Sequence, residues 1–81
     1  MDKKWYVYIL RCADGTLYTG ITNDPQRRLQ QHNAGTASKC TRCRRPVEMV
    51  HQEEVEGKGE ALKREYAIKQ LSRAEKLVLI K

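Results

Sequence analysis

The sequence has few of the features that mark secreted or membrane proteins. It contains three cysteines, an odd number, and no export signal is recognised, so a disulfide framework is not expected. The longest apolar or aromatic run, residues 5–10, is too short for the hydrophobic region of a signal peptide or for a spanning helix. We therefore expect a cytoplasmic protein with reduced thiols.

Internal repeats and low-complexity tracts are also missing. The longest break in the hydrophobic pattern is the polar stretch 33–45, which we interpret as a loop. The 81 residues are therefore expected to form a single domain over residues 1–81. Its core should be modest, because a domain of this size buries only about 60% of the surface of its unfolded chain.

One cysteine pair has the spacing of zinc ligands. Two residues separate Cys40 from Cys43, and Cys12, His32 or His51 could complete a set of four ligands. A second closely spaced pair is lacking. We therefore favour reduced, partly packed thiols over a structural zinc site.

Positive charge is in excess, with 16 Lys and Arg against 10 Asp and Glu and a net charge of +6. This balance favours a polyanionic partner, and nucleic acid is favoured over an acidic protein or a membrane surface. Phosphate contacts are predicted for five cations, which are Arg27, Lys39, Arg42, Arg44 and Arg45. The alternative is that the four in the loop merely keep it soluble. No major-groove recognition helix or aromatic ladder is evident, so recognition of shape or of a single strand is expected.

The secondary-structure pattern begins with a β-hairpin. Residues 5–11 and 16–22 are rich in β-branched and aromatic side chains, and Asp14-Gly15 between them is a turn signal. A two-residue turn would place Tyr8 and Tyr18 on opposite faces of the sheet. A three-residue loop with Gly15 left-handed would pair Cys12 with Thr16 and place both tyrosines on one face, together with Tyr6 and Gly20. We favour the second register.

Helices and one more strand follow. Asp24 and Pro25 predict a helix start, and Gly35 its end. A strand is expected over 46–54, a helix over 60–71, and a short last helix begun by the capping box of Ser72 and Glu75. The pattern predicts an α/β fold with a small three-stranded, mainly antiparallel sheet flanked by helices.

Three residues on the predicted helices could carry chemistry. Arg28 and His32 are four residues apart and share one helix face; an arginine fork fits phosphate, and an imidazole relays protons near neutral pH. Alone they could be a solvated face. Glu65 points into the middle of an apolar stripe, where it could hold Mg²⁺ or Mn²⁺. Alternatively it pairs with Lys69 one turn later.

The tyrosines could simply pack a core, but the combined pattern is more specific. Tyr6-Val7-Tyr8, Tyr18-Thr19-Gly20, Arg28, His32 and Glu65 occur in an order and spacing that resemble the GIY-YIG nucleases. The opening Trp-Tyr-Val-Tyr-Ile-Leu and the ending Leu-Ser-Arg-Ala-Glu-Lys are similar to those of small standalone bacterial members of the YhbQ type. The resemblance extends from residue 5 to residue 71.

This resemblance implies an endonuclease that hydrolyses phosphodiester bonds with one Mg²⁺ or Mn²⁺. Structured DNA in repair or recombination is favoured over RNA as the substrate, and the choice between DNA and RNA stays open. It implies that Tyr8, Tyr18, Arg28, His32 and Glu65 are catalytic. Glu65 would hold the metal, Arg28 would clamp the phosphate, and His32 would orient or deprotonate a tyrosine. Which tyrosine activates the water stays open, because a free phenol has a pKa near 10 and either could be made more acidic.

The sequence departs from the family pattern at several positions. Tyr6 replaces the glycine of the first motif and Thr19 the middle residue of the second. Ile21 stands where the excision-repair members have lysine, and the asparagine of the homing enzymes does not follow Glu65. Two other hypotheses are therefore kept: a nucleic-acid-binding module that needs a protein partner for activity, and a basic adaptor that binds an acidic protein. Retention of all five candidate residues favours the enzyme.

Overall fold

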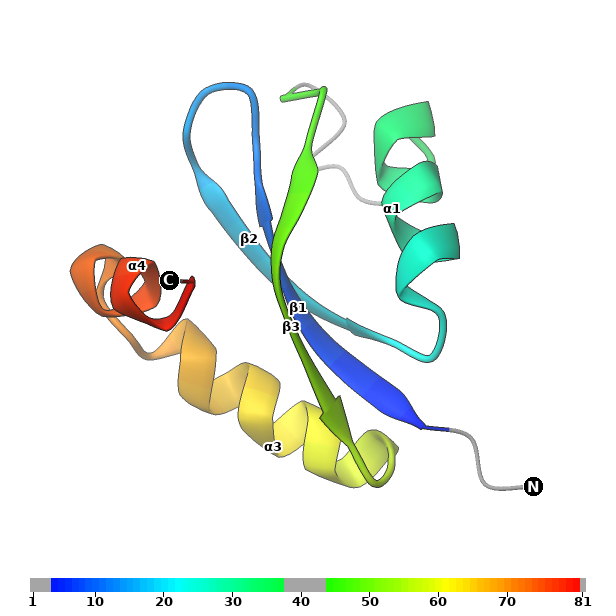
Figure 1. The fold of residues 1–81 in the computed structure, drawn as a ribbon, viewed down its shortest axis with the longest axis vertical. Helices are drawn as coiled ribbons and strands as arrows, with labels where there is room; N and C mark the ends of the chain where they lie inside the picture. The colour runs from blue at the N-terminus through cyan, green and yellow to red at the C-terminus, as the bar shows by residue number, and fades with distance from the viewer. Residues whose placement is uncertain (1–3, 38–43, 81) are drawn as a thin grey trace.

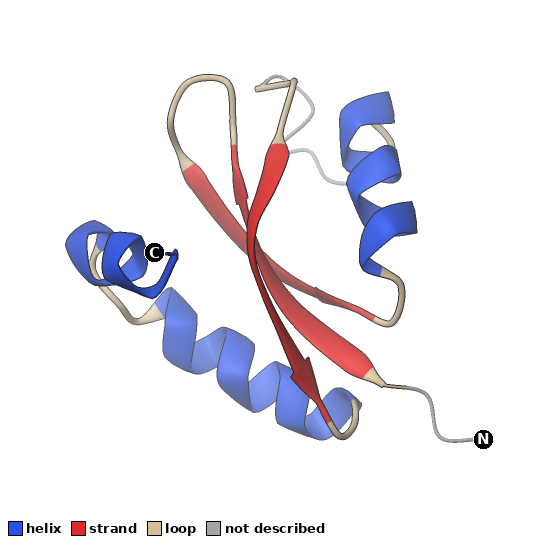
Figure 2. Ribbon diagram, in the orientation of Figure 1, coloured by secondary structure: helices blue, strands red, loops and turns tan. Residues whose placement is uncertain are grey.

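The computed structural model describes residues 4–37 and 44–80 of the chain. Within them, the strands β1 (Trp5–Arg11), β2 (Leu17–Thr22) and β3 (Glu48–Val55) form one antiparallel sheet in the order β2-β1-β3. Helix α1 (Pro25–Ala34) lies on one side of this sheet, whereas α3 (Lys58–Lys69) and α4 (Arg73–Ile80) lie on the other (Figures 1 and 2). The expected fold class and order of elements are confirmed.

The β1–β2 hairpin closes through a three-residue loop. The Cys12 N–H donates to the Thr16 carbonyl at 2.9 Å, and the Gly15 N–H donates to the Cys12 carbonyl at 2.9 Å. Gly15 has φ of +85°, a left-handed conformation that glycine adopts without steric cost. One left-handed residue at the turn thus sets the register of the whole hairpin.

In that register Tyr8 lies opposite Gly20, and Leu10 lies opposite Tyr18. Positions two residues apart on a strand share a face, so both tyrosines point toward α1. The favoured three-residue loop is confirmed, and the two-residue alternative is excluded.

Each face of the sheet has its own apolar core. Because neighbouring side chains of a strand point to opposite faces, the central strand β1 contributes to both. The core under α3 and α4 is built on four buried residues: Val7, Ile9, Ala61 and Ile68. The core on the α1 side is built on four others: Tyr8, Leu10, Cys12 and Val47. The α1-side core therefore contains a candidate catalytic tyrosine.

The predicted helix ends are present. The Asp24 side chain accepts the N–H of the third helical residue at 3.2 Å, Pro25 opens α1, and left-handed Gly35, with φ of +83°, ends it. At the start of α4 the Ser72 N–H donates to Glu75 Oε1 at 2.9 Å, and the Glu75 N–H donates to Ser72 Oγ at 3.2 Å. These reciprocal bonds are those of a capping box.

Several element boundaries differ from the expected ones by one or two residues, including both ends of α3 and the start of β3. α3 begins at Lys58 rather than at residue 60, and extended Gly57 precedes it. The N–H groups of a first helical turn have no partner within the helix, so Gly59 is tolerated at this position. β3 begins at Glu48 rather than at 46. The reason is that Asn33 of α1 takes both main-chain groups of Val47: its Nδ2 donates to the carbonyl at 3.0 Å, and its Oδ1 accepts the N–H at 2.8 Å.

Candidate active site

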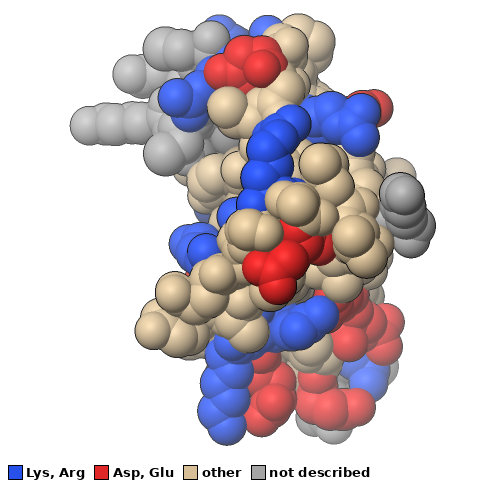
Figure 3. Space-filling view, turned by 90° about the vertical axis from the view of Figure 1, so that its left-hand side faces the viewer, with Lys and Arg blue, Asp and Glu red and all other residues tan. Residues whose placement is uncertain are grey.

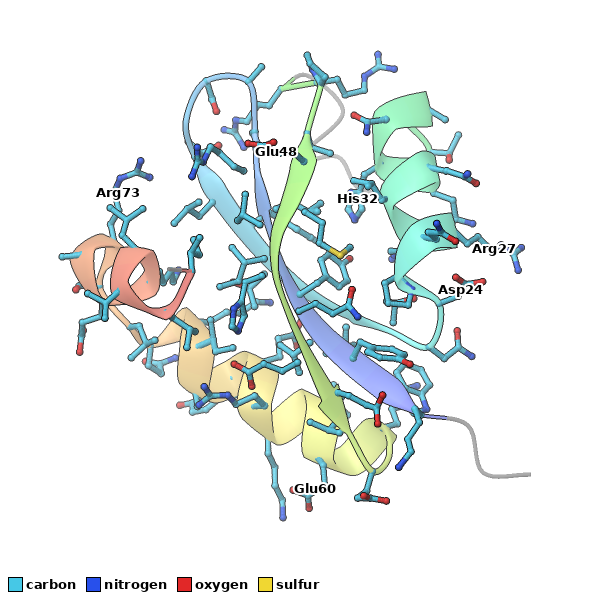
Figure 4. All side chains as sticks on the ribbon, in the orientation of Figure 1. Asp24, Arg27, His32, Glu48, Glu60 and Arg73 are labelled. Atoms are coloured by element: carbon cyan, nitrogen blue, oxygen red, sulfur yellow. The ribbon has the colours of Figure 1, made fainter. Side chains whose placement is uncertain are left out.

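β1, β2 and α1 bring three of the candidate side chains into contact. The Tyr8 hydroxyl lies 3.0 Å from His32 Nε2. The ring of His32 is edge-on to both tyrosines, with centroid separations of 5.9 Å to Tyr8 and 5.2 Å to Tyr18. The two tyrosine rings are 6.4 Å apart. Figure 4 shows His32 pointing from α1 toward the sheet.

Gly20 makes room for this arrangement. A Cβ added there would stand 2.5 Å from the Tyr8 hydroxyl oxygen and 2.7 Å from its Cζ, so the Tyr8 ring lies directly across the glycine. Gly20 was not among the predicted site residues. The available signal was its place in Tyr18-Thr19-Gly20 together with the favoured register, which sets it opposite Tyr8.

Tyr8 and His32 are enclosed rather than open to solvent. Each has 0% of its surface exposed, so this pair does not line an open surface pocket. The reason is that α1 covers the face of the sheet from which Tyr8 projects. A substrate would have to approach beside the pair, at Tyr18 or Arg28, which are only partly buried.

Burial also determines the charge of the pair. It raises the pKa of Tyr8 above the ordinary 10.0; hydrogen bonding by Arg28 and its charge oppose this, while Tyr18 and Glu65 add to it. Burial, and next the positive charge of Arg28, lower the pKa of His32 below the ordinary 6.5. A neutral phenol and a neutral imidazole therefore share the hydrogen bond at neutral pH.

Arg28 has a hydrogen-bond donor that is not used within the described part of the chain. Its Nη1 donates to Gln31 Oε1 at 3.2 Å, one turn along α1. Its Nε is buried and has no hydrogen-bond partner among the residues that the structure describes. A buried guanidinium N–H is rarely left unpaired, and a guanidinium fork matches phosphate oxygens. Gln31, another residue that the sequence did not single out, holds the fork; its only signal is the spacing of three from Arg28.

Glu65 lies in a different layer from the other candidates. It belongs to α3, which covers the opposite face of the sheet, yet its charge contributes to the raised pKa of Tyr8. The ion pair with Lys69 is present at 3.4 Å. The two members are unequal: the Glu65 side chain is 20% exposed and that of Lys69 is 53% exposed. The carboxylate is thus fixed near the sheet, whereas the ammonium can swing into water.

The described residues could bind a metal ion only through a single carboxylate, with other ligands supplied by water and substrate. Among residues 4–37 and 44–80 no group of three or more His, Cys, Asp or Glu could hold an ion. Mg²⁺ is commonly bound by one or two carboxylates, with waters and substrate phosphates completing its shell. Glu65 fits that mode. Of the cysteines considered for zinc, Cys12 is a buried free thiol, and Cys40 and Cys43 lie outside the described residues.

The three predicted phosphate-binding cations that the structure describes do not form one uniform patch. Arg27 is exposed at the start of α1, where it extends away from the sheet (Figure 4). Arg44 pairs with a carboxylate of the hairpin at 3.1 Å, and Arg45 donates to a main-chain carbonyl of α1 at 3.2 Å. Lys39 and Arg42 lie outside the described residues. On the side where α4 lies, cations alternate with carboxylates (Figure 3).

Comparison with known proteins gives a family match and a set of similar relatives. Residues 4–77 match the model of the GIY-YIG catalytic domain. A UPF0213 protein of Halobacterium salinarum is 55% identical over 74 residues, which are 91% of this chain and 96% of that protein. A UPF0213 protein of Staphylococcus saprophyticus is 54% identical over 80 residues, which are 99% of this chain and 96% of that protein.

Solved structures are similar as well. The solution structure of a UPF0213 protein from Bacillus halodurans is 44% identical, with a TM-score of 0.61 over 95% of this chain and 82% of that one. A protein from E. faecalis is 49% identical, with a TM-score of 0.63 over 94% of this chain and 83% of that one. Within the part of the chain that the structure describes, no helix has the length and apolar character needed to cross a membrane. The chain belongs to the GIY-YIG catalytic domain family, whose members are generally nucleases.

Proposed function

We propose that this protein is a divalent-metal-dependent endonuclease that hydrolyses phosphodiester bonds, with structured DNA of repair or recombination as its substrate. The observation that carries the proposal is the buried pair of Tyr8 and His32, 3.0 Å apart, beside an arginine with an unpaired N–H. A structural core would not need to bury a phenol, an imidazole and a guanidinium together, because each loses hydration there.

The pair is suited to move a proton without forming a free tyrosinate. Since burial raises the pKa of Tyr8, its anion would be costly in isolation. In the proposed step α1 moves enough to admit the attacking water beside the enclosed pair. The Tyr8 oxygen then takes a proton from this water while its own proton passes to His32 Nε2. The water oxygen then bonds to phosphorus, and the 3′ oxygen leaves. The lowered pKa of His32 keeps its ring neutral and able to accept.

Arg28 and Tyr18 have positioning roles in this proposal. The Arg28 guanidinium, which is only partly buried, would bind a non-bridging oxygen of the scissile phosphate, and a shift toward the phosphate would give its unpaired Nε a partner. Gln31 keeps the fork from turning away. Tyr18, whose ring packs on the edge of His32 at 5.2 Å, limits where the water can stand. These contacts hold the reacting groups in place, which reduces the entropy that they lose on reaching the transition state.

Glu65 would hold the divalent cation, whose oxygen shell would be completed by waters and phosphate oxygens. When bound, the cation would supply Lewis-acid chemistry, which polarises the phosphate and stabilises the leaving oxygen. The Glu65 carboxylate is mostly buried while its partner Lys69 is mostly in solvent, so release of Lys69 would free it for this role. The negative charge of Glu65 near Tyr8 also disfavours a tyrosinate until it is neutralised.

The test compares Glu65→Gln with Glu60→Gln. Both variants remove one carboxylate of an intrahelical ion pair on α3, but Glu60 is well exposed and pairs with Lys63. We expect Glu65→Gln to slow single-turnover cleavage by about a hundredfold or more, since the metal contributes several kcal/mol. Glu60→Gln should cleave at the rate of the wild type. Both should retain binding, measured by fluorescence anisotropy without divalent cation.

Lys69→Gln separates the two interpretations of Glu65. If the ion pair is the role of Glu65, both substitutions should lower the melting temperature slightly and equally, and neither should alter cleavage. If Glu65 holds the metal, Lys69→Gln should leave cleavage intact while Glu65→Gln abolishes its Mn²⁺ dependence. Equal cleavage by all variants would remove Glu65 from the mechanism. A wild type that binds but cleaves no single-stranded, duplex, flap or branched DNA would favour the binding-module hypothesis.

A further inference from the structure

A cavity of about 410 Å³ adjoins the candidate active site. It lies where the start of α1 and the start of α3 meet the end of β2, and its lining consists of Trp5, Ile21, Thr22, Asn23, Arg28 and Lys58. It thus joins Arg28, the proposed phosphate clamp, to the single tryptophan of the chain. Its volume is in the range of small-ligand sites.

Trp5 presents an aromatic surface to this cavity. The indole is partly exposed and packs against the core on the α3 side. The ammonium of Lys58, an exposed residue, lies 5.6 Å from the centroid of the ring. Stacking of a base on an aromatic ring is worth more than an exposed cation–π contact. A base could therefore take the place of this ammonium over the ring and leave it free to bind a neighbouring phosphate.

The opposite wall leads toward a second cavity. Asn23 is exposed, lines both cavities, and carries an amide that can donate and accept at a base edge. The second cavity has about 440 Å³ and is lined by Lys4, Tyr6, Asn23, Asp24 and Arg27. A chain of nucleotides leaving the first cavity would pass the cations of the second. This continuity suits a polynucleotide better than a free mononucleotide.

We propose that the cavity at Trp5 is a nucleotide subsite, in which the base next to the scissile phosphate stacks on Trp5 and Lys58 binds the adjoining phosphate. The inference rests on the proposed function and specifies its substrate. A base within a duplex is stacked on its neighbours and cannot also stack on Trp5. The substrate class is therefore DNA with an unpaired nucleotide beside the cut, as in a single strand, a loop or an overhang.

Tryptophan fluorescence tests the subsite directly, because Trp5 is the only emitter of its kind in the chain. The wild type, with EDTA present, is titrated with a short oligothymidylate and with an abasic oligomer of the same length. Anisotropy of labelled copies should show that both bind, since the phosphates are the same. Only the oligothymidylate should quench Trp5. Equal quenching by both oligomers, or none at saturation with oligothymidylate, would overturn the subsite.

The position of the base is tested by cleavage. On an oligonucleotide whose cut site has been mapped, bases are removed one at a time from either side of the cut. Removal of the adjacent base should slow cleavage by the wild type about five- to 150-fold, the range for one stacked base. Trp5→Leu should cleave slowly whichever base is missing, and Trp5→Phe, which keeps a ring, should resemble the wild type. A Trp5→Leu variant that still distinguishes the adjacent base would overturn the proposal.

Lys58 has a matched control on the same helix. Lys63 is exposed, pairs with Glu60 and does not line the cavity. Lys58→Gln should weaken binding of the oligothymidylate and reduce its salt dependence by about one phosphate, whereas Lys63→Gln should change neither. Equal losses of binding in the two variants would show that Lys58 acts only through the net charge of the protein, which would overturn its assignment to the phosphate. If the wild type neither binds nor cleaves any of these oligomers, the proposed function itself fails; cleavage without quenching refutes the subsite alone.

Discussion

Gly20→Ala is the sharpest test of the geometry at the centre of the site. The backbone of Gly20 tolerates alanine, because its φ is not positive. The new Cβ, however, would stand 2.5 Å from the Tyr8 hydroxyl oxygen. Tyr8 has no exposed surface and is bonded to His32, so the ring cannot simply swing into solvent. It must move by about 1 Å to reach ordinary van der Waals contact.

This overpacking should cost about 1–3 kcal/mol, which lowers the melting temperature by about 4 to 24 °C for a domain of this size. The displacement should also break the Tyr8–His32 hydrogen bond. A 1 Å misplacement of a reacting group can cost about a hundredfold in rate. We therefore expect single-turnover cleavage to fall by about that factor, while binding of DNA, measured by anisotropy, is retained.

The control is Gly59→Ala, since an added Cβ there meets no atom of the described residues within 4 Å. That variant should be as stable as the wild type or more stable by about 0.4–1 kcal/mol. A second check is Tyr8→Phe combined with Gly20→Ala, which removes the nearest clashing atom and should recover part of the melting temperature but no cleavage. If Gly20→Ala melts and cleaves as Gly59→Ala does, the Tyr8 ring does not lie across Gly20 and the described site is wrong.

Three further predictions follow from the described contacts. Because burial lowers the pKa of His32 below 6.5, the unfolded chain binds a proton in acid that the folded chain does not. The free energy of unfolding should therefore be full above pH 6.5 and decline below it. Urea unfolding at several pH values should show a smaller decline for His32→Gln than for the wild type. Asn33→Ala leaves both main-chain groups of Val47 unpaired and should cost about 1–3 kcal/mol in urea unfolding, whereas Asn33→Asp, which keeps the acceptor, should cost less. Arg44→Ala with Arg45→Ala should weaken DNA binding and flatten its dependence on salt; an unchanged slope in the titrations would leave both as solvated surface.

Local chemistry determined much of the fold. Gly15 set the hairpin register because glycine alone adopts the left-handed turn conformation without cost. Asp24 and Gly35 marked the ends of α1 by satisfying main-chain groups that a helix leaves unpaired. With that register, Tyr8 and Tyr18 necessarily share a face, and the order of the family motifs named the remaining candidates. These features depend on neighbours in the chain, so the sequence could predict them.

The tertiary structure alone decided the environment of each candidate. Whether Tyr8 was open or enclosed depended on how α1 packs across the sheet, and its burial reversed the expected acidification of the phenol. The unpaired Arg28 Nε depends on the same packing. Glu65 was identified from its helix face, but only the placement of α3 on the far side of the sheet put it in another layer. Desolvation and charge act through space, and distances between elements remote in sequence are not contained in a local pattern.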